Sequence, residues 1–332
     1  MRLPFDDLVH TLQRLFLHKG YPPEAAALSA RLIAETSRDG VYSHGLNRVP
    51  RVLAMIDNGS IVVDAKPSRI AGHGGFEQWD GGMGPGNVVA HACMARTLEL
   101  AGEHGIGAVA LRHTNHWMRG GTYGWQAADA GFIGLCWTNT NQNLPPWGGL
   151  SPRIGNNPIV MALPRPEGHV VIDMAMSQFS YGALDSYKKK GQRLPVPGGF
   201  DAAGALTDDP AAIEESGRAL PIGYWKGSAL SIVLDLVAAG LSGGDATCTI
   251  ATDPLLERSL SQVFIAIKPL SPAFVARIAD ETVAHLHASP AVPGQSVHYP
   301  GERTLATRRD NLAHGIPVDA GVWAKIQQAL AH

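Results

Sequence analysis

Between residues 87 and 287 the sequence alternates between helix patterns and short apolar strand patterns, and this alternation limits the possible folds more than any other feature. Apolar residues spaced three to four apart, such as Leu230, Val233 and Val237, indicate helices, whereas short apolar runs indicate buried strands. The expected helices cover residues 87–104, 121–130, 227–241 and 272–287, and the expected strands cover 107–111, 132–138, 159–163, 170–173 and 262–268. Such alternation predicts an α/β domain around a mostly parallel or mixed sheet.

The first sixty residues contain helix patterns alone. The periodicity predicts one helix that ends at Gly20, a second that begins at Pro22, and a third from Leu46 to about residue 56, with His44 at its start. Pro50 falls near the start of the third helix and could kink it. Residues 188–222 are rich in glycine, proline and charge, which predicts a long excursion, residues 289–302 are an expected loop, and a final helix is expected after residue 319.

Length, composition, charge and cysteine spacing exclude several classes of protein. A chain of 332 residues, 45% hydrophobic and 17% charged, is long and apolar enough for about two domains. The net charge of −2 shows no excess of basic residues of the kind that binds nucleic acid. The acidic N-terminus is unlike a signal peptide, and no apolar run approaches the ~20 residues of a membrane span. Three widely spaced cysteines form neither a disulfide framework nor a zinc pattern, so a reducing cytoplasm is expected and a metal site is not.

The segment Ser43-His44-Gly45-Leu46-Asn47-Arg48 is the strongest local indication of chemistry. On a helix, His44 and Arg48 would share a face because they are four residues apart. An imidazole can give a proton to a carbonyl oxygen near neutral pH, and an arginine can bind a carboxylate through two parallel hydrogen bonds. The pair predicts a site that reduces the ketone of a 2-keto acid. The alternative is a surface helix start with two solvated side chains.

The glycine-rich residues 81–86 precede an expected helix but do not favour a Rossmann fold. The GxGxxG spacing is absent, Pro85 interrupts the run, and no apolar strand of normal length is expected before it. We expect a turn that lets the chain pack closely before the helix.

Three other segments carry groups suited to a ligand. His116 lies after a strand expected to end near Leu111, where α/β proteins bind ligands, and is either a second acid/base group or a structural histidine. Lys226 begins an apolar helix, where the helix dipole and free N–H groups attract phosphate. Glu302 could offer a carboxylate to ribose hydroxyls, or could be a solvated loop acid.

Several motifs of one family occur here in the same order: Ser43-His44-Gly45, Asn115-His116-Trp117, the run from Ile172 to Ser177, the run from Gly223 to Gly227, and Pro300-Gly301-Glu302. With these motifs the chain resembles, nearly end to end, the malate/L-lactate dehydrogenase family that lacks a Rossmann fold. The resemblance implies a non-Rossmann NAD(P)-binding α/β fold with a mixed central sheet and an N-terminal helical subdomain. It also implies a homodimer with active sites near the subunit interface.

The resemblance further implies an oxidoreductase that uses NAD(H), with NADP(H) as the alternative, on a small-molecule 2-keto acid. His44 would be the proton donor, with His116 as the competing candidate, and Arg48 and Asn115 would bind the substrate. The implied cofactor-binding residues are Thr140, His169, Val170, Val171, Ile172, Asp173, Met174, Ala175, Met176, Trp225, Lys226, Pro300, Gly301 and Glu302.

Three subdomains are expected. Residues 1–75 form a helical subdomain with which a helix at about 316–331 packs, 76–120 and about 270–315 form a linking α/β part, and 121–269 bind NAD. The expected substrate is 2,3-diketo-L-gulonate, although residues 140–144 and 289–299 depart from the pattern expected for it. The alternatives are malate, lactate, ureidoglycolate or a cyclic imino acid, or a non-catalytic dinucleotide-binding protein.

Overall fold

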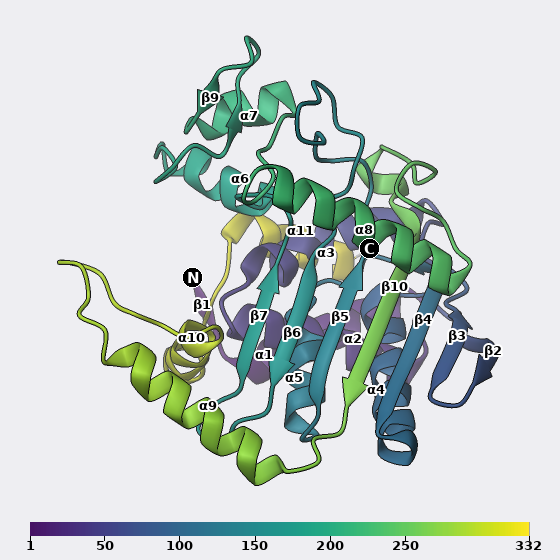
Figure 1. Cartoon of the computed structure of the whole chain (residues 1–332). Coiled ribbons are helices and arrows are strands. Elements are labelled where there is room, and N and C mark those ends of the chain that lie inside the picture. Colours follow the sequence, from purple (N-terminus) through teal and green to yellow (C-terminus); the bar gives the residue numbers. More distant parts are fainter. Residues whose placement is uncertain (332) are drawn as a thin grey trace.

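A seven-stranded sheet forms the centre of the computed structural model, which describes residues 1–331 (Figure 1). Across the sheet the strands are β2 (Ser68–His73), β3 (Phe76–Asp80), β4 (Ile106–Asn115), β10 (Arg258–Ile267), β5 (Ile133–Thr138), β6 (Ile159–Leu163) and β7 (Val170–Met174). In this described sheet β3 and β4 run parallel and the other neighbouring pairs run antiparallel. The predicted mixed sheet is confirmed, and its strand order differs from that of a Rossmann fold.

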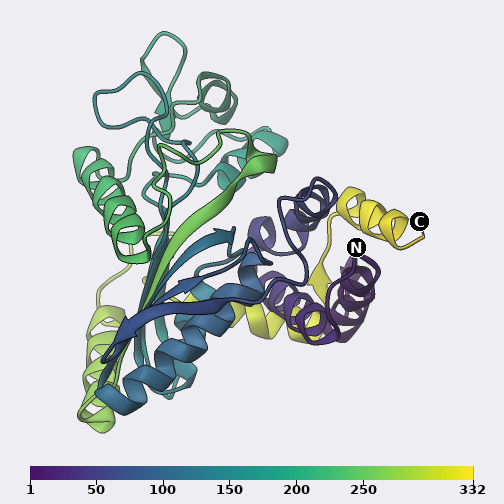
Figure 2. The ribbon, with the colours of Figure 1, turned by 90° about the vertical axis from the view of Figure 1, so that its right-hand side faces the viewer.

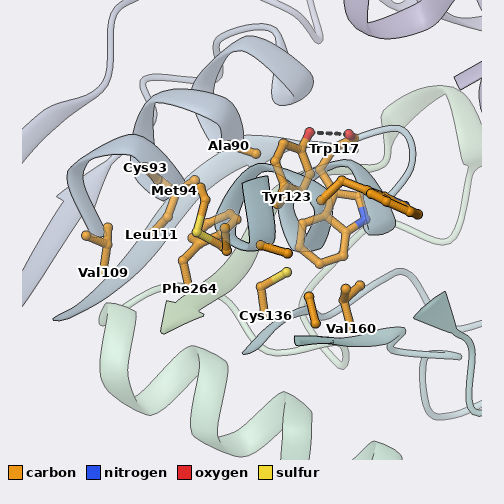
Figure 3. Packing of buried hydrophobic residues seen from close by; sticks show 14 of the residues in the cluster. Ala90, Cys93, Met94, Val109, Leu111, Trp117, Tyr123, Cys136, Val160 and Phe264 are labelled. Atoms are coloured by element: carbon orange, nitrogen blue, oxygen red, sulfur yellow. Dashed lines mark hydrogen bonds between the residues drawn. The ribbon is translucent and has the colours of Figure 1, made fainter. Parts of the chain in front are cut away.

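Helices cover both faces of the sheet. On one face lie α4 (Gly86–His104) and α5 (Gly121–Asp129), which bury a core that includes Met94, Trp117 and Phe264. Figure 3 shows this core, with Trp117, Tyr123 and Phe264 close together. On the opposite face α8 (Trp225–Ser242) packs against the sheet, and α9 (Pro272–His287) runs below it (Figure 2).

Within the described residues, α8 alone has the length of 18 residues and the mean hydropathy of 1.2 that a membrane span requires. No helix of this kind was expected from the sequence, in which no apolar run approaches the ~20 residues of a membrane span. One face of α8 packs on the sheet through Leu234 and Ala238. Asp235 accepts hydrogen bonds from Asn139 and from the backbone of Thr247, so this helix forms a layer of the fold.

The N-terminal residues form a separate helical layer, as expected. α1 (Phe5–His18), α2 (Pro23–Arg38) and α3 (Val49–Asp57) share a core with α11 (Ala320–Ala331), and β1 (Arg2–Leu3) pairs with β11 (Ile316–Pro317). Figure 2 shows α11 beside the N-terminal helices, to one side of the sheet. The predicted final helix is confirmed, and Asp319 caps it by accepting a hydrogen bond from the backbone of Val322.

The excursion expected at residues 188–222 lies beyond one end of the sheet (Figure 1). Together with the residues just before it, it contains α6 (Tyr181–Lys189), β8 (Gly199–Phe200), β9 (Leu206–Thr207) and α7 (Pro210–Ser216). Leu184, Leu194 and Ile213 give it a small core of its own.

Three expectations of secondary structure were wrong or incomplete. β2 and β3 were missed because β2 is exposed along its whole length and carries no apolar alternation. α10 (Glu302–His314) was also missed, since its sequence is polar almost all round. The third helix is shorter than predicted: residues 42–44 and 46–48 form two 3₁₀ turns, and α3 begins only at Val49. Pro50 lies in its first turn, where proline fits without a kink.

The glycine-rich run serves close packing, as predicted, although β3 does lead into it. A Cβ atom on Gly86 would lie 2.3 Å from the carbonyl oxygen of Asn115 and 2.4 Å from that of His116. Only glycine therefore lets the start of α4 approach this backbone. That contact fixes the end of β4, from which His116 projects.

Candidate active site

His44 and His116 meet at a cavity of about 210 Å³ between the helical layer and the sheet. Their ring centroids are 5.7 Å apart and the rings are stacked. The cavity is also lined by Ser43, Arg119, Thr140, Asn156, Asp173, Ala175 and Ser180. Two competing acid/base candidates thus face the same space, although 72 residues separate them in the chain.

The backbone around His44 is held by close packing against α2. Ser37 Oγ accepts a hydrogen bond of 2.8 Å from the backbone N–H of Leu46, and a Cβ atom on Gly45 would lie 2.3 Å from that same oxygen. Gly45, with a φ of −103° and a ψ of −127°, separates the two 3₁₀ turns. The assumption that His44 and Arg48 share a face of one helix was therefore wrong. Ser43 Oγ lies 3.0 Å from His44 Nδ1 and orients the ring.

His116 sits in a tightly held loop. The backbone N–H of Met118 donates to His116 Nδ1 over 3.1 Å, so the neutral ring carries its proton on Nε2. The phenol of Tyr123 donates to the carbonyl of Trp117 over 2.5 Å, a bond drawn in Figure 3. β4 runs to Asn115, further than the strand expected to end near Leu111, so His116 follows directly from a buried strand.

Both imidazoles are neutral at pH 7 in the protein without substrate. Burial is the main cause that lowers the pKa of His44 to about 4, and the charges of Arg48, Arg119 and Arg51 lower it further. Burial and Arg48 also lower the pKa of His116 well below its usual range. A histidine that donates a proton here must first gain one. A bound anion would favour that gain, because it offsets the arginine charges.

Arg48 is not among the residues that line this cavity, and it forms an ion pair with Glu257. Its Nη2 is 3.5 Å from Glu257 Oε2, and Arg51 reaches the same oxygen at 2.7 Å. Burial and the neighbouring charge of Arg51 lower the pKa of Arg48 to about 10. Glu257 is 3% exposed and also lies 3.5 Å from the backbone nitrogen of Asn141. Sequence reasoning missed Glu257 and Arg51, because the pairing joins segments about 200 residues apart.

Asn115 makes internal hydrogen bonds. Its Nδ2 donates to the carbonyl oxygens of Met83 and Gly84 over 2.7 and 3.0 Å, and the residue is 1% exposed. These bonds tie the end of β4 to the glycine-rich turn. The predicted role of Asn115 in substrate binding stays a prediction.

Thr140 and Asp173 form two walls of the cavity. The backbone N–H of Thr140 donates to Asn157 over 3.0 Å, and its hydroxyl donates to Asn156 over 3.2 Å. Asp173 Oδ2 accepts a hydrogen bond of 2.7 Å from the backbone N–H of Gly121, at the start of α5. Asp173 thereby fixes the end of β7 against the loop that carries His116.

The predicted cofactor segments lie along β7, the edge strand of the sheet (Figure 1). At its start, the backbone N–H of Val171 donates to the carbonyl of Pro300 over 2.9 Å. At its end, the carbonyl of Met176 accepts from Ile222 over 2.8 Å, three residues before Trp225. The structure thus places residues 169–176 beside residues 300–302 and beside Ile222, just before the start of α8. The far end of β7 borders the cavity through Asp173.

Gly301 and Glu302 are shaped by their neighbours. Gly301 has a φ of +103°, and a Cβ atom there would lie 2.9 Å from the carbonyl oxygen of His169. Burial acts to raise the pKa of Glu302, but hydrogen bonds from His298, His287 and the backbone of Tyr299 outweigh it and lower that pKa. Glu302 is therefore an ionised acceptor beside β7.

His169 and the start of α8 likewise already have protein partners. His169 Nε2 lies 2.9 Å from Asp129 Oδ1, and its Nδ1 accepts from the backbone of Arg165. At the start of α8, the backbone N–H groups of Lys226 and Gly227 donate to nearby carbonyls. The expectation of free N–H groups there was wrong for these two residues. The exposed side chains of Trp225 and Lys226 remain available.

Among residues 1–331, no group of three or more His, Cys, Asp or Glu side chains is placed to hold a metal ion.

Known proteins resemble this chain in sequence and in structure. The sequence model of the malate/L-lactate dehydrogenase family matches residues 3–327. The 2,3-diketo-L-gulonate reductase of Escherichia coli is 45% identical over 334 aligned residues, which cover 98% of this chain and 99% of that protein. Sulfolactate dehydrogenase from Methanocaldococcus jannaschii superposes with a TM-score of 0.92 at 25% identity, over 100% of this chain and 97% of that one. Δ1-Piperideine-2-carboxylate reductase from Pseudomonas syringae superposes with a TM-score of 0.88 at 29% identity, over 99% of each chain.

Proposed function

Because the chain belongs to the malate/L-lactate dehydrogenase family, we propose that it is an NADH-dependent 2-keto acid reductase that converts 2,3-diketo-L-gulonate to 3-keto-L-gulonate. One observation supports the chemistry most strongly: two partly buried imidazoles face one small cavity at the end of the edge strand along which the cofactor segments gather. The substrate rests on the 45% identity to the E. coli reductase over nearly the whole of both chains.

The residues around β7 fit a dinucleotide. Four features support this. β7 is an edge strand, and a Cβ atom on Gly301 beside it would meet backbone. The ionised Glu302 would accept from ribose hydroxyls, and the charge of Lys226 would attract phosphate. Glu302 favours NADH over NADPH, because a carboxylate that accepts from the 2′-hydroxyl repels a 2′-phosphate. When bound, the cofactor supplies the hydride that reaches C2 of the acid.

The side chains of this protein orient the acid and deliver the proton. We assign the carboxylate to Arg48 and the proton donation at the C2 oxygen to His44, with His116 as the competing donor. The bound carboxylate offsets the charge of Arg48, raises the pKa of His44 and lets the ring take up the proton that it then gives to the oxygen. General acid catalysis of this kind contributes about 10²–10⁴-fold to a rate.

A panel of 2-keto acids, read by loss of NADH absorbance, tests the proposal. We expect the highest kcat/KM with 2,3-diketo-L-gulonate and lower values with pyruvate, oxaloacetate and Δ1-piperideine-2-carboxylate. A higher kcat/KM for one of those three acids would reassign the substrate within the family. NADH binding without turnover of any acid would favour the non-catalytic alternative.

We further infer that the protein acts as a homodimer in the cytoplasm. α8 exposes a row of apolar side chains, of which Val233 is 53% and Leu236 is 61% exposed. Apolar faces of this kind commonly mark subunit contacts. Light scattering after gel filtration should give twice the chain mass of 35.2 kDa, and a Leu236→Glu variant should shift toward the monomer. The three cysteines are free, as expected in a reducing compartment.

A further inference from the structure

Arg119 brings a guanidinium group to the wall of the cavity, and the mechanism above does not use it. The residue is 6% exposed and lines the cavity together with His44, His116 and Asp173. Its Nη1 donates to Asp39 Oδ2 over 2.7 Å. Its Nε is buried and has no hydrogen-bond partner among residues 1–331. A buried donor without a partner is uncommon and indicates a missing acceptor.

Asp39 does not neutralise this arginine. Asp39 is 5% exposed, and its carboxylate also accepts hydrogen bonds from Arg38 and, through two bonds of 2.8 and 2.7 Å, from Arg308. Three guanidinium groups therefore share one carboxylate, and these arginines hold the pKa of Asp39 at about 2. The three guanidinium groups outnumber this one carboxylate, and Asp129 and Glu35 act on Arg308 as well. Arg119 is the member of the cluster at the cavity, where Asp173 is its other charged neighbour.

Arg119 Nε lies on the same side of the cavity as Asp173, near His44. A Cβ atom on Gly121 would lie 3.1 Å from Arg119 Nε and 3.0 Å from Asp173 Oδ2, so both atoms border the same point. The charge of Arg119 also lowers the pKa of His44, which places it within electrostatic reach of that ring. Arg119 is thus a cation that lines the cavity, distinct from Arg48, which does not line it but lowers the pKa of both imidazoles.

We propose that Arg119 determines specificity by donating a hydrogen bond from Nε to an oxygen on C3 of the substrate, next to the carbonyl that is reduced. This inference rests on the proposed function. The proposed roles of Arg48 and His44 account for the carboxylate and the C2 oxygen, and a 2,3-dioxo acid has one further oxygen beside them. A 2-keto acid without that oxygen leaves Nε unpaired, and sites with an unpaired buried donor discriminate strongly against such analogues.

The test compares 2,3-diketo-L-gulonate with 2-oxobutanoate, which has no oxygen on C3. Arg119→Lys keeps the charge beside Asp39 but loses the planar fork and its Nε donor. We expect it to lower the ratio of kcat/KM for the dioxo acid to that for 2-oxobutanoate by at least about tenfold. The matched control is Arg308→Lys, which changes another guanidinium on the same carboxylate outside the cavity. It should leave this ratio as it is in the wild type. NADH affinity, measured by fluorescence titration, checks that each variant is folded.

Equal losses on both acids in Arg119→Lys would overturn the proposal, because they would show a general or structural role. An unchanged ratio would overturn it as well, and so would an equal fall of the ratio in Arg308→Lys. The wild type tests the proposed function separately: if it reduces 2-oxobutanoate but not the dioxo acid, the assigned substrate is wrong irrespective of the variants.

Discussion

The low pKa of His44 predicts how the stability of the protein changes with pH. In the folded protein this pKa is about 4, whereas the ordinary value of 6.5 applies to the unfolded chain. Between these two pH values the unfolded chain binds a proton at residue 44 that the folded protein does not bind. The free energy of unfolding therefore falls as the pH drops through this window, and His44 costs no stability above it.

The size of this effect follows from the two pKa values. At a pH of about 5 the linkage relation gives a loss of about 2 kcal/mol from His44, and at a pH of about 7.5 it gives almost none. His44→Asn removes the titrating ring and keeps a polar side chain of similar reach. We expect the variant, compared with the wild type, to be more stable at pH 5 by about 2 kcal/mol beyond any difference at pH 7.5.

Urea unfolding at both pH values, followed by tryptophan fluorescence, measures this difference. The value at pH 7.5 is the internal control, since it contains the packing cost of the substitution but not the titration. If wild type and His44→Asn lose the same stability between pH 7.5 and pH 5, the ring is not buried as a neutral group. The electrostatic account of the site would then be refuted.

The other predictions concern the proposed roles one by one. His44→Ala should lose about 10²–10⁴-fold in kcat for keto-acid reduction and still bind NADH, whereas a loss below about tenfold would assign the proton to His116. Arg48→Lys should raise the KM for the acid more than it changes NADH affinity, because lysine lacks the planar fork; an unchanged KM would remove Arg48 from the substrate site. Lys226→Ala should weaken NADH binding, with a smaller effect at high salt, and unaltered titrations would leave Lys226 with no role beyond covering the start of its helix.

The parts of the fold that could be predicted are those with a strong apolar pattern. β5, β6 and α8 follow from their runs of apolar residues, because burial on a sheet face or against a sheet needs such runs. β2 and α10 could not be found in this way, since β2 is exposed and α10 is polar almost all round. α10 is held by contacts with α2, which lies far away in the sequence, and local propensity does not report those contacts. β2 pairs with the next strand, β3, and this pairing leaves no apolar pattern in the sequence of β2.

The candidate site also contains residues that the sequence could predict and residues that it could not. His44 and His116 were identified from local motifs, and the structure brings them together. The ion pair of Arg48 with Glu257 and the cluster around Asp39 join residues far apart in the sequence, so no spacing could reveal them. The sequence could not predict that both imidazoles are neutral, because their low pKa values come from burial and from arginines that the fold places beside them.

A crystal structure with NADH tests the central claim most directly. The account predicts density for the dinucleotide along the outer edge of β7, with the adenosine near Glu302, the phosphates near Lys226, and the nicotinamide at the cavity shared by His44 and His116. Density far from β7, or a nicotinamide ring outside that cavity, would contradict the claim and remove the basis of the assigned cofactor site.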